Sequence, residues 1–187
     1  MARFLLLITA AVTLLSCSDI FSTRDPEDPQ GNTDNYFSES VPELEANFKT
    51  ALLGLDPYLY ESLFFNLPET GSYFRFISQA SDVEQSIFND WNIENEKIFI
   101  NGLKASNISL SEIDLNSGSY DETADSTSID IEYSMKVSDA DGEYFINGNF
   151  TFYIVKLDGL FWYIKTWTDI SSQGNVSFSK LKAPYAF

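Results

Sequence analysis

The stretch FYIVKLDGLFWYIKTWTDIS, residues 152–171, holds the pattern that decides the fold. Two aromatic-rich segments flank Asp158-Gly159, and an Asp-Gly pair in this position is typical of a two-residue β-hairpin turn. Upstream, STSIDIEYSMKV (residues 126–137) alternates strictly between apolar and polar side chains, which predicts an antiparallel strand with one buried face. A second Asp-Gly pair at 141–142 joins the two regions. The sequence therefore predicts a meander of three long antiparallel strands.

Two-residue turns also predict which side chains share a face, because successive side chains of a strand point to opposite faces. They place Phe150 between Tyr133 and Trp167, and they place Gly148 opposite Asp169. One face then carries a set of candidate pocket residues: Tyr133, Phe150, Tyr163, Lys165, Trp167 and Asp169. The other face carries an apolar patch: Tyr153, Val155, Leu157, Leu160, Trp162 and Ile164.

Helical signals precede these strands. Ser40 and Glu43 form a capping-box pair, and Asp56-Pro57 is typical of an N-cap followed by a first helical turn. The predicted helices cover residues 40–55, 57–65 and 92–104, with a short strand at 73–77. Residues 107–115 predict a further strand, and its alternation slips near Glu112, which indicates a bulge.

The first 16 residues are typical of a signal peptide, because Arg3 precedes an apolar run that is too short to span a bilayer. The run ends in Leu-Leu-Ser-Cys, which resembles the lipobox of bacterial lipoproteins and implies acylation of Cys17. An ordinary secretory signal with an incidental cysteine is the alternative. Ser18 replaces the aspartate that retains enterobacterial lipoproteins in the inner membrane, so the resemblance favours the outer membrane. Residues 17–37 then predict a flexible tether.

Composition excludes several classes of function. The chain has 187 residues, a net charge of −17, no histidine and a single cysteine. This acidity argues against nucleic-acid binding, and the missing histidine excludes His-based triads and His-ligated zinc. The acidic turn at residues 139–143 fits a calcium loop poorly, because Val137 and Gly148 fall at its two end ligand positions. We expect no metal and no cofactor.

Three helices before a long meander, together with the final hairpin LDGLFWYIKTWTD (residues 157–169), resemble the nuclear transport factor 2-like (SnoaL-like) cone fold. The resemblance covers residues 38–187. It implies an α+β domain in which three N-terminal helices pack on a curved antiparallel sheet, with a pocket between the concave face and the helices. It does not fix a function, because ketosteroid isomerases, polyketide cyclases, dehydratases, transport adaptors and interaction domains share this fold.

The pocket residues allow three interpretations. In a catalytic one, Asp169 acts as a general base and Tyr133 or Tyr163 donates to an oxyanion, a pairing found in ketosteroid isomerases. In the second, the aromatic face binds a ligand without catalysis, and Gly148 leaves space beside Asp169. In the third, the aromatic residues are ordinary core, and Lys165 and Asp169 lie near the open rim, either solvated or paired with residues of the helices.

The apolar patch on the opposite face predicts a contact surface, since monomers seldom expose large contiguous apolar areas. A second copy of the chain, giving a homodimer, and the segment FSKLKAPYAF (residues 178–187) are both candidates to cover it. The sequence as a whole predicts a lipid-anchored cell-envelope protein that binds a small apolar ligand or a protein partner without catalysis. The alternatives are a small isomerase- or cyclase-like enzyme that uses Asp169, and a purely structural assembly protein.

Overall fold

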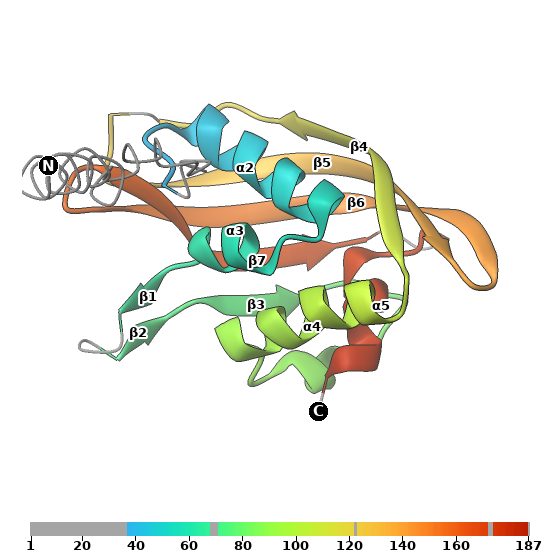
Figure 1. Cartoon of the computed structure of the whole chain (residues 1–187). Coiled ribbons are helices and arrows are strands. Elements are labelled where there is room, and N and C mark those ends of the chain that lie inside the picture. Colours follow the sequence, from blue (N-terminus) through green and yellow to red (C-terminus); the bar gives the residue numbers. More distant parts are fainter. Residues whose placement is uncertain (1–36, 68–70, 122, 172–173, 187) are drawn as a thin grey trace, which may run out of the picture. The chain divides into compact units, whose positions relative to one another are not determined.

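A curved five-stranded sheet forms the centre of the structure, with the strand order β3-β7-β6-β5-β4 (Figure 1). Its strands are β3 (Arg75–Ser78), β4 (Ser109–Ser117), β5 (Ser126–Asp139), β6 (Gly142–Leu157) and β7 (Phe161–Ile170). This computed structural model describes residues 37–67, 71–121, 123–171 and 174–186. The predicted signal peptide and Cys17 lie outside the described residues, as does the predicted tether up to residue 36.

The sheet is mixed, which corrects the prediction of an entirely antiparallel one. β4, β5, β6 and β7 pair antiparallel in sequence order. β3, however, lies parallel to β7, with Phe76 opposite Trp167. A short hairpin turn forces antiparallel pairing, but β3 is separated from β7 by α4 and the meander and can pair in either direction.

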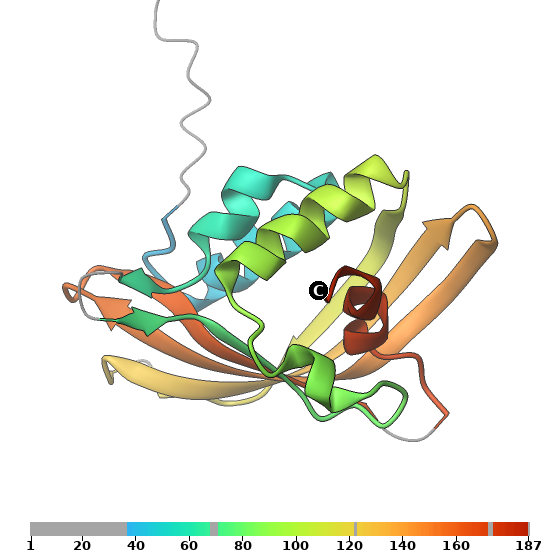
Figure 2. The same cartoon turned by 90° about the horizontal axis from the view of Figure 1, so that it is seen from below.

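Helices cover one face of the sheet. The elements before β4 are, in order, α2 (Val41–Gly54), α3 (Pro57–Ser62), β1 (Asn66–Leu67), β2 (Ser72–Tyr73), β3, the 3-10 turn η2 (Gln85–Phe88) and α4 (Ile93–Ala105). Figure 2 shows α2, α3 and α4 on the side toward which the sheet curves. β1, β2 and β3 separate α3 from α4, and β3 overlaps the short strand that was predicted at residues 73–77. α3 also ends before the predicted Phe65, whose N–H donates to the Ile164 carbonyl of β7 (2.9 Å).

In the hairpin between β5 and β6, the side chains lie on the predicted faces, but the pairing register differs from the predicted one. Asp139 pairs with Gly142, so the turn closes one residue earlier than expected. Tyr133 consequently lies opposite Gly148 instead of Phe150. Each partner changes by two residues, and this preserves the faces because side chains repeat with a period of two.

The hairpin between β6 and β7 contradicts the predicted two-residue turn. Leu157 pairs with Phe161, and the Leu160 N–H donates to the Leu157 carbonyl (3.0 Å), so the loop contains three residues. One extra residue reverses the faces that follow it. Trp162 and Ile164 were expected on the outer face, and both are buried in the core.

A bulge in β7 then restores the predicted faces. The register with β6 shifts by one residue, and Lys165 is left without a partner in β6. Trp167 and Asp169 therefore point inward as predicted, and both are buried. The bulge expected in β4 is confirmed, since the register with β5 shifts between Ser111 and Asp114 around Glu112, whose φ is 47°.

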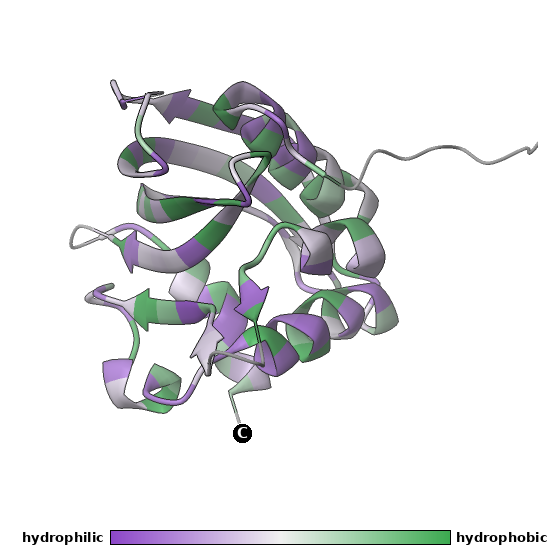
Figure 3. Cartoon of the chain, turned by 90° about the vertical axis from the view of Figure 1, so that its left-hand side faces the viewer, coloured by the Kyte–Doolittle hydropathy of each residue, from purple (hydrophilic) through white to green (hydrophobic). Residues whose placement is uncertain are grey.

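The core lies between the concave face and the helices. Apolar and polar residues alternate along the strands in Figure 3. The inward apolar side chains join those of the helices in one cluster. Phe48 of α2 lies at its centre, because its ring has edge-on contacts with Phe150, Phe152 and Trp167 at centroid distances of 6.1, 5.3 and 5.3 Å. These contacts fix α2 against β6 and β7.

Candidate functional site

The segment after β7 enters the interior of the cone. It forms the short helix α5 (Phe178–Lys182) and the 3-10 turn η3 (Ala183–Tyr185), and Figure 2 shows α5 on the concave side of the sheet. Phe178, Ser179 and Lys182 are fully buried. The space in which the resemblance places a ligand pocket therefore contains side chains of the protein itself.

Asp169 of β7 holds the first turn of α5. Its Oδ2 accepts hydrogen bonds from the backbone N–H and the hydroxyl of Ser179 (2.6 and 2.5 Å), and its Oδ1 accepts one from the Tyr133 hydroxyl (2.8 Å). The Tyr133 oxygen in turn accepts the Phe178 N–H (2.8 Å). N–H groups in the first turn of a helix have no acceptor within that helix, and the side chains of Asp169 and Tyr133 provide acceptors for two of them. Asp169 thus works as an anchor for α5.

The electrostatics of this pair resemble those of an acid–base site. Burial raises the pKa of the Asp169 carboxyl above its ordinary value, and the hydrogen bonds from Ser179 and Tyr133 act in the opposite direction. Burial also raises the pKa of the Tyr133 hydroxyl, and the nearby Asp169 charge raises it further. The tyrosine therefore stays neutral and donates. A general base must also reach a substrate proton, and both Asp169 oxygens already accept from the protein.

Gly148 of β6 makes room for Tyr133, and both residues also line an open pocket of about 310 Å³. A Cβ at this position would lie 2.7 Å from the Tyr133 hydroxyl oxygen and 2.7 Å from the Ile170 carbonyl oxygen. The Tyr133 ring stacks on the Phe150 ring, with ring centroids 3.9 Å apart. The hole that the sequence predicted beside Asp169 is filled by the tyrosine that bonds to it.

A buried ion pair joins α5 to α4. Lys182 Nζ lies 2.5 Å from Glu96 Oε1, and neither side chain is exposed to solvent. Trp91 Nε1 donates to the same oxygen (2.8 Å), and the Tyr60 hydroxyl donates to Glu96 Oε2 (2.8 Å). Both carboxylate oxygens are therefore satisfied, as a buried charge requires.

Aromatic rings surround the ammonium group of Lys182. Nζ lies 3.7 Å from the Trp167 ring centroid and 3.8 Å from that of Phe76, within cation–π distance. Three further rings stand at 5.4, 5.5 and 5.4 Å: Trp91, Phe99 and Phe178. Burial lowers the pKa of Lys182 to about 8, against the opposing effect of Glu96. At neutral pH the lysine is thus predominantly charged inside an aromatic cage.

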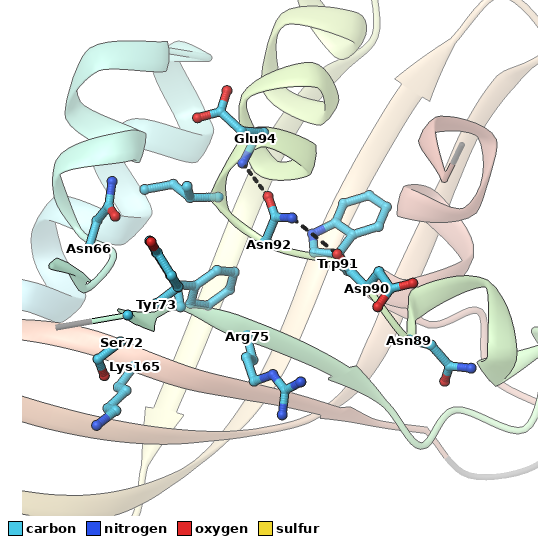
Figure 4. A pocket seen from close by; sticks show the side chains of 13 residues that line it. Asn66, Ser72, Tyr73, Arg75, Asn89, Asp90, Trp91, Asn92, Glu94 and Lys165 are labelled. Carbon is cyan, nitrogen blue, oxygen red and sulfur yellow. Dashed lines mark hydrogen bonds between the residues drawn. The ribbon is translucent and has the colours of Figure 1, made fainter. Parts of the chain in front are cut away.

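An open cleft of about 820 Å³ lies between β2–β3 and the start of α4 (Figure 4). This volume is in the range of small-molecule sites. Tyr73, 46 % exposed, offers an aromatic surface, and Arg75 and Lys165 bring positive charge. Asn66 and Asp90 add polar groups to the lining.

Two of the predicted pocket residues lie away from Asp169. Lys165 lines the open cleft, with Nζ 5.2 Å from the Phe65 ring centroid, because the β7 bulge takes it off the concave face. Tyr163 lines a shallow hollow with Tyr58, since the three-residue loop reversed its face. The other predicted pocket residues lie together in the packed interior: Tyr133, Phe150, Trp167 and Asp169.

The predicted interface patch does not form one continuous surface. Trp162 and Ile164 are buried, and of the remaining four residues only Tyr153 and Leu160 are exposed, at 38 and 59 %. The segment at 178–187 was a candidate to cover this outer face, but its buried residues lie in the core: Phe178, Ser179, Leu181 and Lys182. Trp162 and Ile164 are buried because of the three-residue loop between β6 and β7. The C-terminal segment is held away from the outer face because α5 is anchored to Asp169.

Glu96, Ser179 and Lys182 were not among the predicted site residues. The spacing of Glu96 could have indicated that it is buried, because it lies three residues after Ile93 and three before Phe99 on the buried side of α4. A carboxylate in an apolar helical stripe must have a buried partner. Nothing in the sequence identified Lys182 as that partner, since the two residues meet only through the tertiary fold.

No helix in the part of the chain that the structure describes is long and apolar enough to cross a membrane. Within the same residues, no group of three or more His, Cys, Asp or Glu side chains is arranged to hold a metal ion.

No family model and no curated protein matches the sequence. Solved structures do match the fold. A ketosteroid isomerase-like protein from Erwinia carotovora has a TM-score of 0.52 at 6 % identity, over 70 % of this chain and 92 % of that one. An NTF2-like protein from Cytophaga hutchinsonii has a TM-score of 0.51 at 13 % identity, over 68 and 92 %. An NTF2-like protein of unknown function in nutrient uptake from Rhodospirillum rubrum has a TM-score of 0.51 at 12 % identity, over 68 and 94 %. Such identities establish the fold alone, and the described domain has the nuclear transport factor 2-like cone fold.

Proposed function

We propose that the protein is a lipid-anchored cell-envelope protein whose cone domain binds a ligand and does not catalyse a reaction. The state of Asp169 carries this proposal. Its side chain is fully buried, and its oxygens accept from Ser179 and Tyr133. A catalytic base needs hydrogen-bond reach to a substrate proton, whereas Asp169 reaches only its own chain.

The membrane anchor rests on the sequence around Cys17. Acylation there would hold the protein at the outer membrane without a spanning helix, because two or more acyl chains form a stable anchor. Fractionation of cells that express Cys17→Ser tests this part of the proposal. We expect the variant in the soluble fraction or as an unprocessed precursor. A normally processed variant that stays on the membrane would contradict the anchor.

The open cleft in Figure 4 is the place that we assign to the ligand. The buried side chains of α5 occupy the space in which the sequence predicted a small apolar ligand. In the cleft, Tyr73 offers a flat face, and neither Arg75 nor Lys165 has an ion-pair partner among the described residues. We therefore propose a small polar molecule that combines an apolar face with hydrogen-bond acceptors.

Phenyl glucuronide has these features and serves as the probe. NMR titration of the full-length protein should shift the amide signals of β2, β3 and the first turn of α4. Tyr73→Ala or Arg75→Ala should weaken binding about tenfold, equivalent to about 1.4 kcal/mol. Tyr153→Ala is the matched control, because it removes an exposed tyrosine outside this cleft. Absent shifts in the cleft, or an equal loss in the control, would contradict this assignment.

The enzymatic alternative has one observation in its favour, the raised pKa of Asp169 beside the neutral hydroxyl of Tyr133. Catalysis would require α5 to leave the carboxylate. A β,γ-unsaturated 3-ketosteroid tests this alternative, because its isomerisation to the conjugated ketone is followed by ultraviolet absorbance. We expect no rate above that of buffer. A rate that disappears in Asp169→Asn would establish the enzyme and overturn our proposal.

A homodimer is the remaining proposal for the outer face, and it would suit an assembly role. Only Tyr153 and Leu160 of the predicted patch are exposed there. Gel filtration of the wild-type protein and of Leu160→Glu tests it. A dimer that the substitution dissociates would support pairing through this face, and a monomer in both samples would exclude it.

A further inference from the structure

The interior of the cone is built as a receptor for an ammonium group. Glu96 accepts from the ammonium, and Tyr60 and Trp91 hold the carboxylate in place. Five aromatic rings stand within 5.5 Å of Lys182 Nζ, and four of them lie outside α5: Phe76, Trp91, Phe99 and Trp167. The same combination of a carboxylate and an aromatic cage recognises free cations in ligand-binding proteins. Here the cation comes from α5.

One group in this interior is left unsatisfied. Trp167 Nε1 is buried, and it has no hydrogen-bond partner among the described residues. Buried polar groups nearly always have a partner, so an orphan donor calls for an explanation. The donor belongs to the ring closest to the Lys182 ammonium, at 3.7 Å. The Lys182 ammonium is therefore paired with Glu96, while Trp167 Nε1 beside it remains a free donor in the described part of the chain. Lys182 has no acceptor group to offer this donor.

The element that delivers Lys182 is held by hydrogen bonds at its start and by the side chains of Phe178 and Leu181, which are buried in the core. α5 has five residues, too few for a helix to be stable by itself in water. Its start is fixed by the bonds of Ser179 to Asp169 and of the Ser177 N–H to Asp82 (2.9 Å). Donors and acceptors of this kind find water as a replacement partner when a segment leaves. The hydrogen bonds of α5 can therefore be exchanged for bonds to water, and Phe178 leaves the core together with the helix.

We infer that the cone interior is a binding site for a primary aliphatic ammonium ligand, and that Lys182 occupies it as an internal ligand. An external amine takes the place of the lysine when α5 moves out. Glu96 then binds the ligand ammonium, the rings of Trp167 and Phe76 cover it, and Trp167 Nε1 donates to an acceptor group of the ligand. This inference goes beyond the proposed function, because it concerns the interior and not the open cleft.

Chemical complementation tests the inference on the full-length protein. Lys182→Ala removes three carbons and the ammonium nitrogen, which n-propylammonium replaces. We expect n-propylammonium to raise the melting temperature of this variant saturably, by about 5 °C or more, relative to equal sodium chloride. Neutral 1-propanol should not do so. Lys180→Ala is the matched control, since Lys180 is an exposed lysine of the same helix and its loss opens no interior site. A missing shift, an equal shift with 1-propanol, or an equal shift in the control would overturn the inference.

A second variant covers the case in which Lys182→Ala does not fold. Ser179→Ala leaves Glu96 and Lys182 intact and weakens the attachment of α5 to Asp169. Because apparent affinity rises with the population of the open state, n-butylammonium should bind this variant at least tenfold more tightly than wild type. Titration followed by tryptophan fluorescence measures the difference. Equal affinities, or no binding by Ser179→Ala, would overturn the inference.

Discussion

Replacing Lys182 with methionine should destabilise the protein severely, although the two side chains are similar in size and apolar length. The change leaves the Glu96 carboxylate buried with only the neutral donors of Tyr60 and Trp91. Breaking a buried ion pair in this way costs about 3–5 kcal/mol. For a domain of this size, that corresponds to a decrease of roughly 6–20 °C in melting temperature.

The double variant Glu96→Gln/Lys182→Met should recover most of this loss. Glutamine still accepts from Tyr60 and Trp91, and a thioether packs well among aromatic rings. Urea denaturation of the two single variants and of the double variant gives the coupling energy directly. Lys136→Met is the control, because Lys136 pairs with Glu143 at the surface (2.9 Å), where the loss of an ion pair changes stability little. If Lys182→Met costs no more than this control, or the double variant is no better than the sum, the account of the ion pair is wrong.

Three further predictions follow from particular contacts. Because burial lowers the pKa of Lys182 to about 8 in the folded state, against 10.5 ordinarily, the unfolded chain holds the extra proton between these values. Stability in urea should therefore rise from pH 8 toward about pH 10, by up to about 1.4 kcal/mol per pH unit, and Lys182→Met should abolish the rise. Gly148→Ala should cost about 1–3 kcal/mol in urea denaturation, since its Cβ would collide with the Tyr133 hydroxyl; unchanged stability would refute this packing. Trp162→Glu should unfold the domain, as seen by circular dichroism, because the side chain is buried, whereas a folded variant would contradict the observed β7 register.

The alternation in β5 predicted its inward face correctly even though the turn was misplaced. The error changed each partner by two residues, so Tyr133 and Met135 kept their faces and both are buried. A strict pattern of period two is tolerant of even shifts. The inward position of Tyr133 could therefore be read from the sequence, while its partner Gly148 could not.

β7 was harder because two local irregularities compensate each other. The three-residue loop placed Trp162 and Ile164 on the face opposite to the predicted one. The bulge at Lys165 then reversed the alternation, so that Trp167 and the residues after it lie on their predicted faces. β7 is aromatic or apolar on both faces near its start, so alternation there carries little information. Loop length and bulge position depend on packing against α3 and β3, which the sequence does not display.

The candidate site depends on contacts between distant parts of the chain. Asp169 was recognised as an inward carboxylate, but its partner Ser179 lies beyond the predicted elements. The pairing of Glu96 with Lys182 spans 86 residues and has no local signature. Sequence patterns report the face on which a side chain lies, and they do not report which residue meets it there.

The occupation of the cone interior by Lys182 is the central claim, and NMR of the lysine side chains in the full-length protein tests it most directly. Because Nζ lies over the Trp167 and Phe76 rings, ring currents should move the Cε protons of Lys182 strongly upfield. Its buried ammonium protons should also exchange slowly with solvent. The account predicts one such shifted and protected lysine, assigned by its disappearance in Lys182→Met. Lys182 signals that coincide with those of exposed Lys180, with fast ammonium exchange, would contradict it.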